Sequence, residues 1–366
     1  MPHQWLKIPV LIAGVALLSD SALPQPPDAV RISQTQNATI GLIADGPGST
    51  DTRIAADIAQ VLDDGDRLRI LPMLGGGSVQ NIADLIYLKG VDVAIVHTDI
   101  LTQTMQNGTI PRQGSIQYIA KLFQEEIHIL ARKDIAGLND LTGKVVAIGP
   151  LGSGTELTAT ALMETAHIVP NVTHDNQSAA LERLRHGEIA AMFVIGGRPV
   201  PMLQAIEPGT GLHFIPIPLT AQLVDLYVPT SLDHQFYPNL VAAGPPVETV
   251  AIGSVLITLG TPADTARARR VNRFVDTLFE RFDQFRHPGF HPKWQEVSLT
   301  AQISGWTRYP EVLTLLRKDP LGDPSMRTSF DTYLNQSGQT MTGINNERRE
   351  ALFRDFLHWR NQRSGP

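Results

Sequence analysis

Three short segments of the sequence combine glycines with a hydroxyl residue, each between an apolar run and a helix-like run. They are DGPGSTD (45–51), LGGGSVQN (74–81) and GPLGSGTE (149–156). Glycines let backbone N–H groups approach a ligand closely. The first N–H groups of a helix, at the positive end of its dipole, favour an anion. Each segment, called a glycine loop below, therefore predicts an anion-binding loop. The alternative is that the serines only cap helices and the glycines only make turns.

The third glycine loop argues against a nucleotide as the ligand. Gly149 and Gly154 have the spacing of the G-x-x-x-x-G-K-[ST] phosphate loop, but Thr155 stands where that motif has its lysine. The missing lysine would meet the β- and γ-phosphates. About five hydrogen bonds of roughly 1.5–3 kcal/mol each would supply the ~8 kcal/mol that micromolar affinity requires. Ser78, Ser153, Thr155 and nearby N–H groups are the donors expected to make them. A small carboxylate is thus the predicted ligand, with no metal or cofactor.

Three further residues are candidates for contacts with the other groups of the ligand. Arg198 follows a strand in GGRP and is either a bidentate partner for a carboxylate or a solvated rim residue. Asp99 either binds a ligand ammonium or caps the helix that follows it. Tyr237 belongs to an irregular segment that either covers the ligand or packs as ordinary structure. His97 either changes its charge with pH or is a histidine with ordinary partners near a strand end, and we favour the second interpretation. The HPGFH pair (287–291) is not expected to bind metal, because its Pro and Gly interrupt a helix.

Composition and motif content exclude other classes of function. The net charge is −6 and no basic stretch stands out, which argues against a nucleic-acid partner. The sequence has no cysteine, and therefore no disulfide, thiolate metal site or cysteine nucleophile. It also lacks the G-x-S-x-G and H-E-x-x-H motifs of hydrolases and metalloproteases. We expect a protein that is not an enzyme.

The N-terminus has the three-part pattern of a secretory signal. A single Lys7 precedes an apolar run (8–18), and small and polar residues follow it. The apolar run is shorter than the ~20 residues that span a bilayer comfortably. Residues 1–24 are therefore the predicted signal peptide, and the expected location is the periplasm. An uncleaved membrane anchor is the alternative.

From about residue 39 the pattern alternates between apolar strands and amphipathic helices. Such alternation predicts an α/β fold with a mostly parallel sheet and helices on both faces. The expected discontinuous first domain comprises 38–128 and 250–366, with a helical extension from about 287, and the second domain comprises 129–249. We expect a long helix over 263–285 and another over 346–360. Ligands of open α/β sheets bind at the carboxyl ends of strands, so the three glycine loops are expected to meet at one cleft between the domains.

Four longer segments carry a resemblance to a known family. GKVVAIGPLGSGTELTA, GGSVQNIADLIYLKGVDVAIVHTDI, LERLRHGEIAAMFVIGGRPVP and LYVPTSLDHQFYPN resemble the solute receptors of TRAP transporters, of the TAXI type, and the resemblance covers about residues 39–260. It implies a two-lobed periplasmic-binding-protein-like fold (type II) that closes on a small carboxylate, commonly glutamate-like. It also implies a membrane permease, the TRAP membrane subunit with fused small and large components, as the partner.

The resemblance also identifies binding positions. The matching residues are Gly77, Ser78, Asn81, Thr98, Asp99, Gly152, Ser153, Gly154, Thr155, Gly197 and Pro199. The first glycine loop adds Gly48, Ser49 and Thr50, the GGRP motif adds Arg198, and the irregular segment adds Tyr237. The family's first loop usually continues with an aromatic residue, whereas this chain has Asp51. The tail from residue 287 also extends beyond the family's compact receptors.

The sequence therefore predicts a monomeric, exported receptor for a small organic anion such as an amino acid, dicarboxylate or oxoacid, acting by hinge closure. One alternative keeps the binding fold but serves an ABC importer or a membrane sensor. Another is an exported enzyme that uses the same anion-binding loops for a phosphorylated or acyl substrate.

Overall fold

The computed structural model describes residues 38–106, 108 and 115–318 of the 366-residue chain. The predicted signal peptide (1–24) and the expected helix over 346–360 lie outside these residues. No helix within the described ranges is long and apolar enough to cross a membrane.

The described strands form one mixed sheet in the order β2-β1-β3-β10-β4-β7-β5-β6, with β8 paired to β4 and β9 to β10. The strands are β1 (Thr39–Ala44), β2 (Arg69–Leu74), β3 (Val93–His97), β4 (Ile116–Arg132), β5 (Val145–Ala147), β6 (Asn171–Thr173), β7 (Ala191–Gly196), β8 (Leu212–Phe214), β9 (Val228–Leu232) and β10 (Val247–Leu259). Strand β1 pairs in parallel with β2 and β3, and β5 pairs in parallel with β6 and β7.

The expectation of a mostly parallel sheet needs correction at its centre. Both long strands, β4 and β10, pair antiparallel with each other and with their other neighbours. Strand β4 pairs with β10 over 116–126 and with β7 over 126–131, so its partner changes at Glu126. Each long strand therefore belongs to two groups of shorter strands, a long-range arrangement that a local apolar pattern does not encode.

The helices follow the strands as expected. They are α2 (Thr50–Leu62), α3 (Ser78–Tyr87), α4 (Thr98–Gln106), α5 (Gly154–Thr165), α6 (Gln177–Arg185), α7 (Pro201–Gln204), α8 (Ala221–Leu226), α9 (Ala266–Arg281) and α10 (Pro310–Lys318), with 3₁₀ turns η1 (Leu138–Leu141), η2 (Phe282–Arg286) and η3 (Pro292–Gln295). The helix expected over 263–285 is thus α9 followed by η2. Its start is set by Thr265, whose hydroxyl accepts the Ala268 N–H.

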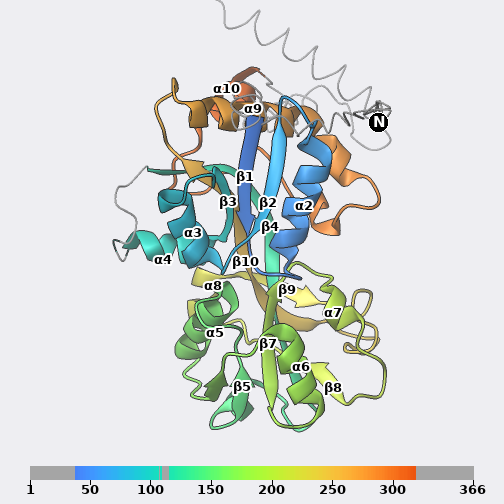
Figure 1. The fold of residues 1–366 in the computed structure, drawn as a ribbon. Coiled ribbons are helices and arrows are strands. Elements are labelled where there is room, and N and C mark those ends of the chain that lie inside the picture. Colours follow the sequence, from blue (N-terminus) through green and yellow to red (C-terminus); the bar gives the residue numbers. More distant parts are fainter. Residues whose placement is uncertain (1–37, 107, 109–114, 319–366) are drawn as a thin grey trace, which may run out of the picture. The chain divides into compact units, whose positions relative to one another are not determined.

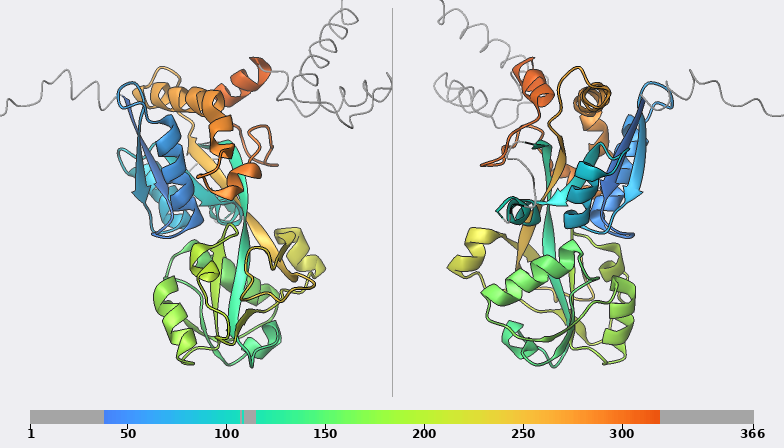
Figure 2. Two further views of the ribbon diagram at one scale, coloured as in Figure 1. Left: turned by 90° about the vertical axis from the view of Figure 1, so that its right-hand side faces the viewer. Right: turned by 60° about the vertical axis from the view of Figure 1, so that its left-hand side comes forward.

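The elements form two groups, which Figure 1 shows above and below one another. Lobe 1 contains β1–β3, α2–α4, α9, α10, η2 and η3. Lobe 2 contains β5–β9, α5–α8 and η1. Strands β4 and β10 run through both lobes, as the further views in Figure 2 show. The buried clusters divide in the same way, because β4 gives Phe123 to a lobe 1 core and Ile127 to a lobe 2 core. The domain boundaries named from the sequence stay a prediction.

The segment after α9 is part of the lobe 1 core. Trp294 of η3 is 1% exposed and stacks on Phe285 with ring centroids 4.1 Å apart. Its indole N–H donates to Asp57 Oδ2 of α2 at 2.9 Å. The described part of the C-terminal extension therefore packs into the fold and brings its polar residues close to β4.

Candidate functional site

The glycine loops of the two lobes meet directly. Gly77, with φ of 114°, precedes α3, and a Cβ added to it would lie 3.0 Å from the backbone nitrogen of Gly154. A Cβ added to Gly154 would lie 2.9 Å from Nδ1 of His97. Only residues without a side chain permit this approach between α5 of lobe 2 and the loops of lobe 1.

The first glycine loop reaches lobe 2 by a different contact. Thr50, at the start of α2, accepts the Gly197 N–H on its hydroxyl at 2.9 Å. All three loops therefore lie at contacts between the lobes. We call this region, which comprises the three glycine loops, His97 and Gly197, the seam.

The serine hydroxyls of the loops bind the protein's own backbone. Ser49 accepts the Thr52 N–H at 3.1 Å, and Ser153 accepts the Glu156 N–H at 3.2 Å. Both serines are helix N-caps, as in the capping interpretation. Ser78 differs, because its Oγ accepts the His97 N–H of strand β3 at 2.9 Å.

Some backbone donors at the seam are free. Among the residues that the structure describes, the N–H groups of Ser78, Gly154 and Thr155 donate to no protein acceptor. They belong to the first turns of α3 and α5, where helices leave N–H groups unsatisfied. Ser78 and Thr155 are 4% and 8% exposed, so these donors are shielded from bulk solvent.

A buried charged cluster lies beside these donors. It consists of Asp51 in the first turn of α2, His97 at the end of β3 and Glu125 on β4, all less than 4% exposed. Nε2 of His97 lies 2.5 Å from Oε2 of Glu125 and 3.9 Å from Oδ2 of Asp51. Ser254 of β10 donates to the other Asp51 oxygen at 2.9 Å. The other ring nitrogen of His97, Nδ1, is buried without a partner in the described part of the chain.

Burial and the neighbouring charges shift the pKa values of His97 and Asp51. Burial by itself would lower the pKa of His97, but the charge and hydrogen bond of Glu125 and the charges of Asp51 and Asp99 raise that pKa to about 10. Burial, and then repulsion from Glu125, raise the pKa of Asp51 well above its ordinary value despite His97. Burial likewise raises the pKa of Asp45. At neutral pH the cluster therefore contains an imidazolium facing Glu125.

The same cluster offers a set of metal-ligating atoms. One nitrogen and two carboxylate oxygens of Asp51, His97 and Glu125 lie within 4.8 Å of one another. A zinc ion accepts such ligands. A metal would have to displace the proton that Nε2 shares with Glu125.

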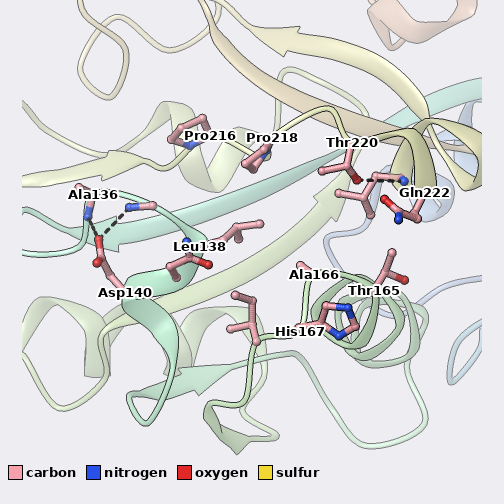
Figure 3. Close-up of a pocket in the computed structure, with 14 residues that line it drawn as sticks. Ala136, Leu138, Asp140, Thr165, Ala166, His167, Pro216, Pro218, Thr220 and Gln222 are labelled. Atoms are coloured by element: carbon pink, nitrogen blue, oxygen red, sulfur yellow. Dashed lines mark hydrogen bonds between the residues drawn. The ribbon is translucent and has the colours of Figure 1, made fainter.

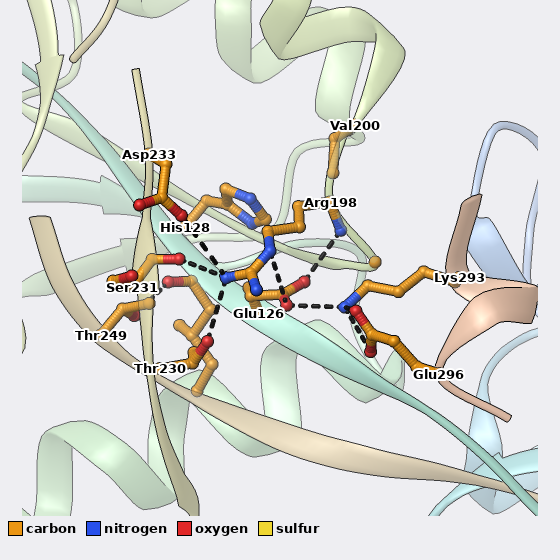
Figure 4. A network of polar contacts seen from close by, with 12 residues as sticks. Glu126, His128, Arg198, Val200, Thr230, Ser231, Asp233, Thr249, Lys293 and Glu296 are labelled. Atoms are coloured by element: carbon orange, nitrogen blue, oxygen red, sulfur yellow. Dashed lines mark hydrogen bonds and ion pairs between the residues drawn. The ribbon is translucent and has the colours of Figure 1, made fainter. Parts of the chain in front are cut away.

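A second polar network surrounds Glu126, the next residue of β4 (Figure 4). Lys293, which is 1% exposed, binds Oε1 of Glu126 at 2.7 Å and Glu296 at 2.8 Å. From lobe 2, the backbone N–H of Arg198 donates to Oε2 of Glu126 at 2.8 Å, and its guanidinium lies 3.5 Å from Oε1. Burial raises the pKa of Glu126, and the two cations partly offset that effect.

The guanidinium of Arg198 is thus held by the protein. It donates to the Thr230 hydroxyl at 3.0 Å and to the Ser231 carbonyl. It also lies over the Phe236 ring, 5.5 Å from the centroid. The peptide bond from Arg198 to Pro199 is cis. A role for either residue in ligand binding stays a prediction.

The other residues expected from the sequence have varied surroundings. Tyr237 is 1% exposed, and its hydroxyl bonds Nε2 of His128 and the Val200 N–H, both at 2.9 Å. Asp99 accepts the hydroxyl of Thr158 in α5 at 2.9 Å, which makes another contact across the seam.

Asn81 donates to the Ile95 carbonyl at 3.2 Å, and its Oδ1 is buried without a partner among the described residues. Thr98 lies against Gly253, whose added Cβ would lie 3.2 Å from the threonine hydroxyl. Gly48 and Gly152 are exposed, with positive φ. Ligand contact by any of them stays a prediction.

Sequence reasoning missed Glu125, Glu126 and Lys293. The two adjacent glutamates interrupt a strand that is otherwise apolar, and buried carboxylates require partners. That interruption was the available signal. Lys293 had no such signal, since its neighbours in HPKWQ are typical of a surface turn.

A separate pocket of about 580 Å³ lies in lobe 2 (Figure 3). Residues of η1, the end of α5 and the segment 216–223 line it, and the glycine loops do not contribute. Asp140 faces it from η1 but already accepts the N–H groups of Ala136 and Gly137. Nothing in the sequence analysis pointed to this pocket.

The chain matches one protein family and is similar to several solved structures. The model of the NMT1-like family matches residues 44–307, well over half of the chain. Among solved structures, an ancestral arginine-binding protein bound to arginine is 14% identical, with 68% of this chain and 96% of that chain covered at a TM-score of 0.40.

A TctC solute-binding protein from Polaromonas is 19% identical, with 67% and 88% of the two chains covered and a TM-score of 0.39. The BenM effector-binding domain with benzoate is 13% identical, with 74% and 98% covered and a TM-score of 0.41.

The predicted fold class, a two-lobed α/β architecture of the periplasmic-binding-protein type, is confirmed. These similarities do not extend to the TRAP transporters or their TAXI type, and that assignment stays a prediction. The chain belongs to the NMT1-like family.

Proposed function

We propose that the protein is a periplasmic solute receptor that closes its two lobes on a small carboxylate at the seam. The observation that supports this most is the convergence of free, buried N–H groups from α3 of lobe 1 and α5 of lobe 2. Helix N-termini favour a negative charge, and here two lobes supply them to the same place. The expected ligand is an amino acid, a dicarboxylate or an oxoacid.

The connection between the lobes suits hinge closure. Strands β4 and β10 pass through both lobes, and Glu126 marks the point where β4 changes its partner from β10 to β7. Polar contacts across the seam include Thr50 with Gly197 and Asp99 with Thr158. Such contacts break on opening and re-form on closing, which allows ligand entry without unfolding either core.

We further propose that the partner is a TRAP-type membrane component that recognises the closed form, and that the protein binds its solute without converting it. Incubating the purified protein with L-glutamate, succinate or 2-oxoglutarate should leave each compound chemically unchanged. Product formation would favour the enzyme alternative instead.

Calorimetry on the purified protein with L-glutamate, succinate and 2-oxoglutarate tests the proposal. We expect micromolar binding of at least one of these, and an affinity at least tenfold weaker in Gly154→Ala, because the new methyl group would occupy the seam. Gly244→Ala is the matched control, since a Cβ there meets nothing within 4 Å. If none of the three binds at millimolar concentration, the proposal fails.

A further inference from the structure

The geometry points to His97 as the residue that recognises the carboxylate, by donating from its Nδ1–H to one carboxylate oxygen at the seam. This inference rests on the proposed function and names the cationic residue of the same site. The sequence favours a histidine with ordinary partners at position 97, but one of its two ring nitrogens has no partner among the described residues.

The two ring nitrogens have different surroundings. Nε2 bonds Glu125, whereas Nδ1 is buried and has no partner among the described residues. A Cβ placed on Gly154 would lie 2.9 Å from Nδ1, so this nitrogen faces the first turn of α5. Burying a polar atom without a hydrogen bond costs free energy, and native proteins rarely leave one unpaired. An acceptor atom of a ligand would remove that cost.

The groups around Nδ1 are donors. The free N–H groups of Gly154 and Thr155 belong to the turn that Nδ1 faces. The Ser78 hydroxyl lies 3.8 Å from the same added Cβ of Gly154. Its oxygen already accepts the His97 N–H, which leaves the hydroxyl hydrogen to donate. Strand β3, helix α3 and helix α5 thus direct donors to one place, and such a set of donors favours an anion over a cation.

The opposite side of the ring faces carboxylates. Oε2 of Glu125 lies 2.5 Å from Nε2, and Oδ2 of Asp51 lies 3.9 Å from the same nitrogen. Nε2 is therefore engaged by Glu125, and Nδ1 is the nitrogen that faces the seam. A doubly protonated imidazole donates from both nitrogens, here to Glu125 and to the ligand.

Asp51, His97 and Glu125 also offer ligands for a metal ion. Such an ion would bind Nε2 in place of the proton shared with Glu125, and Nδ1–H would still donate, as it does in other metal-bound histidines. A metal therefore does not supply the acceptor that Nδ1 lacks.

The test compares wild type with His97→Gln, which keeps a polar side chain and removes the charge. Calorimetry with L-glutamate, succinate and 2-oxoglutarate should show about tenfold to hundredfold weaker binding in the variant, the range expected for losing a charged hydrogen bond. The exposed His167→Gln is the matched control and should bind as wild type.

A second measurement needs no variant. In protein labelled with ¹⁵N-histidine, NMR should show His97 as an imidazolium at pH 7, with the Nδ1 resonance shifting when the carboxylate binds. This result decides the matter if His97→Gln does not fold.

Each outcome separates the two proposals. If none of the three carboxylates binds to wild type, the proposed function itself fails. If one binds and His97→Gln changes its affinity less than twofold, the receptor stands and the role of His97 is overturned. An unshifted Nδ1 resonance at saturation also overturns it.

Discussion

At the scale of single residues, adjacent glutamates on β4 do different work. Glu125 faces His97 and takes part in the charged cluster, whereas Glu126 faces Lys293 and Arg198. Neighbouring residues of a strand point to opposite faces, which explains how one dipeptide serves two networks. Each carboxylate is buried, so each depends on its own cations and donors.

Removing the charge of Glu126 should destabilise the fold. Glu126→Gln leaves Lys293 buried with only Glu296 as its carboxylate, and we expect the free energy of unfolding to fall by about 3 kcal/mol. Urea unfolding measures it. Glu182→Gln is the control, because its pair with Arg185 is exposed and should contribute less than about 1 kcal/mol. Equal losses in the two variants would contradict the prediction.

The stability should also depend on pH through His97. Its pKa in the fold, about 10, lies above the ordinary value of 6.5. A group whose pKa is raised by folding stabilises fully below its unfolded pKa and loses that contribution as pH rises through the folded pKa. Stability should therefore decline between pH 6.5 and 10, and less steeply in His97→Gln. Urea midpoints across this range test it, and identical slopes would refute the assignment.

At the scale of elements, the segment η2–η3 anchors the C-terminal part of the chain to lobe 1. Trp294 packs on Phe285 and bonds Asp57 of α2, while the adjacent Lys293 reaches Glu126 of β4. The adjacent residues Lys293 and Trp294 thus belong to a charge network and to a hydrophobic core, respectively. The part of the C-terminal extension that contains them is therefore integrated into lobe 1.

Trp294→Ala should be strongly destabilising. It removes a large buried side chain and leaves a cavity, for which we expect about 3–5 kcal/mol less unfolding free energy. Tyr87→Ala is the control, since Tyr87 is 73% exposed and its loss should have little effect. Thermal and urea unfolding of both variants provide the comparison. A small effect at Trp294 would show that the segment is not part of the core.

At the scale of the whole molecule, the lobes are held by two continuous strands and by contacts at the seam. The hydrogen bond from Thr158 of α5 to Asp99 of α4 is one that separation of the lobes would break. Neither of these two residues belongs to the hydrophobic clusters of the lobes. Weakening this bond should therefore shift opening and closing without unfolding either lobe.

Thr158→Val replaces the hydroxyl by a methyl group of similar shape. We expect a larger radius of gyration by small-angle scattering, and several-fold weaker carboxylate binding, because the closed form loses a bond that the open form lacks. Thr165→Val is matched to it, since that hydroxyl lies in the same helix but bonds Ala161 within it. If both variants scatter and bind alike, the contact does not control closure.

Local patterns were sufficient for the elements and for part of the site. Apolar runs followed by amphipathic ones identified β1 with α2 and β5 with α5, because side-chain periodicity reflects burial. Ser49 and Ser153 proved to be helix caps, the alternative that local chemistry already offered. The glycines of the loops marked where backbone segments approach closely.

The tertiary structure alone decided which charges meet. Asp51, His97 and Glu125 come from three separate elements, and Lys293 reaches Glu126 across 167 positions of sequence. It also decided that β4 and β10 run antiparallel through both lobes. Periodicity records which faces of an element are buried but not what covers them. The partners of a buried charge depend on the packing of distant elements, which no local pattern contains.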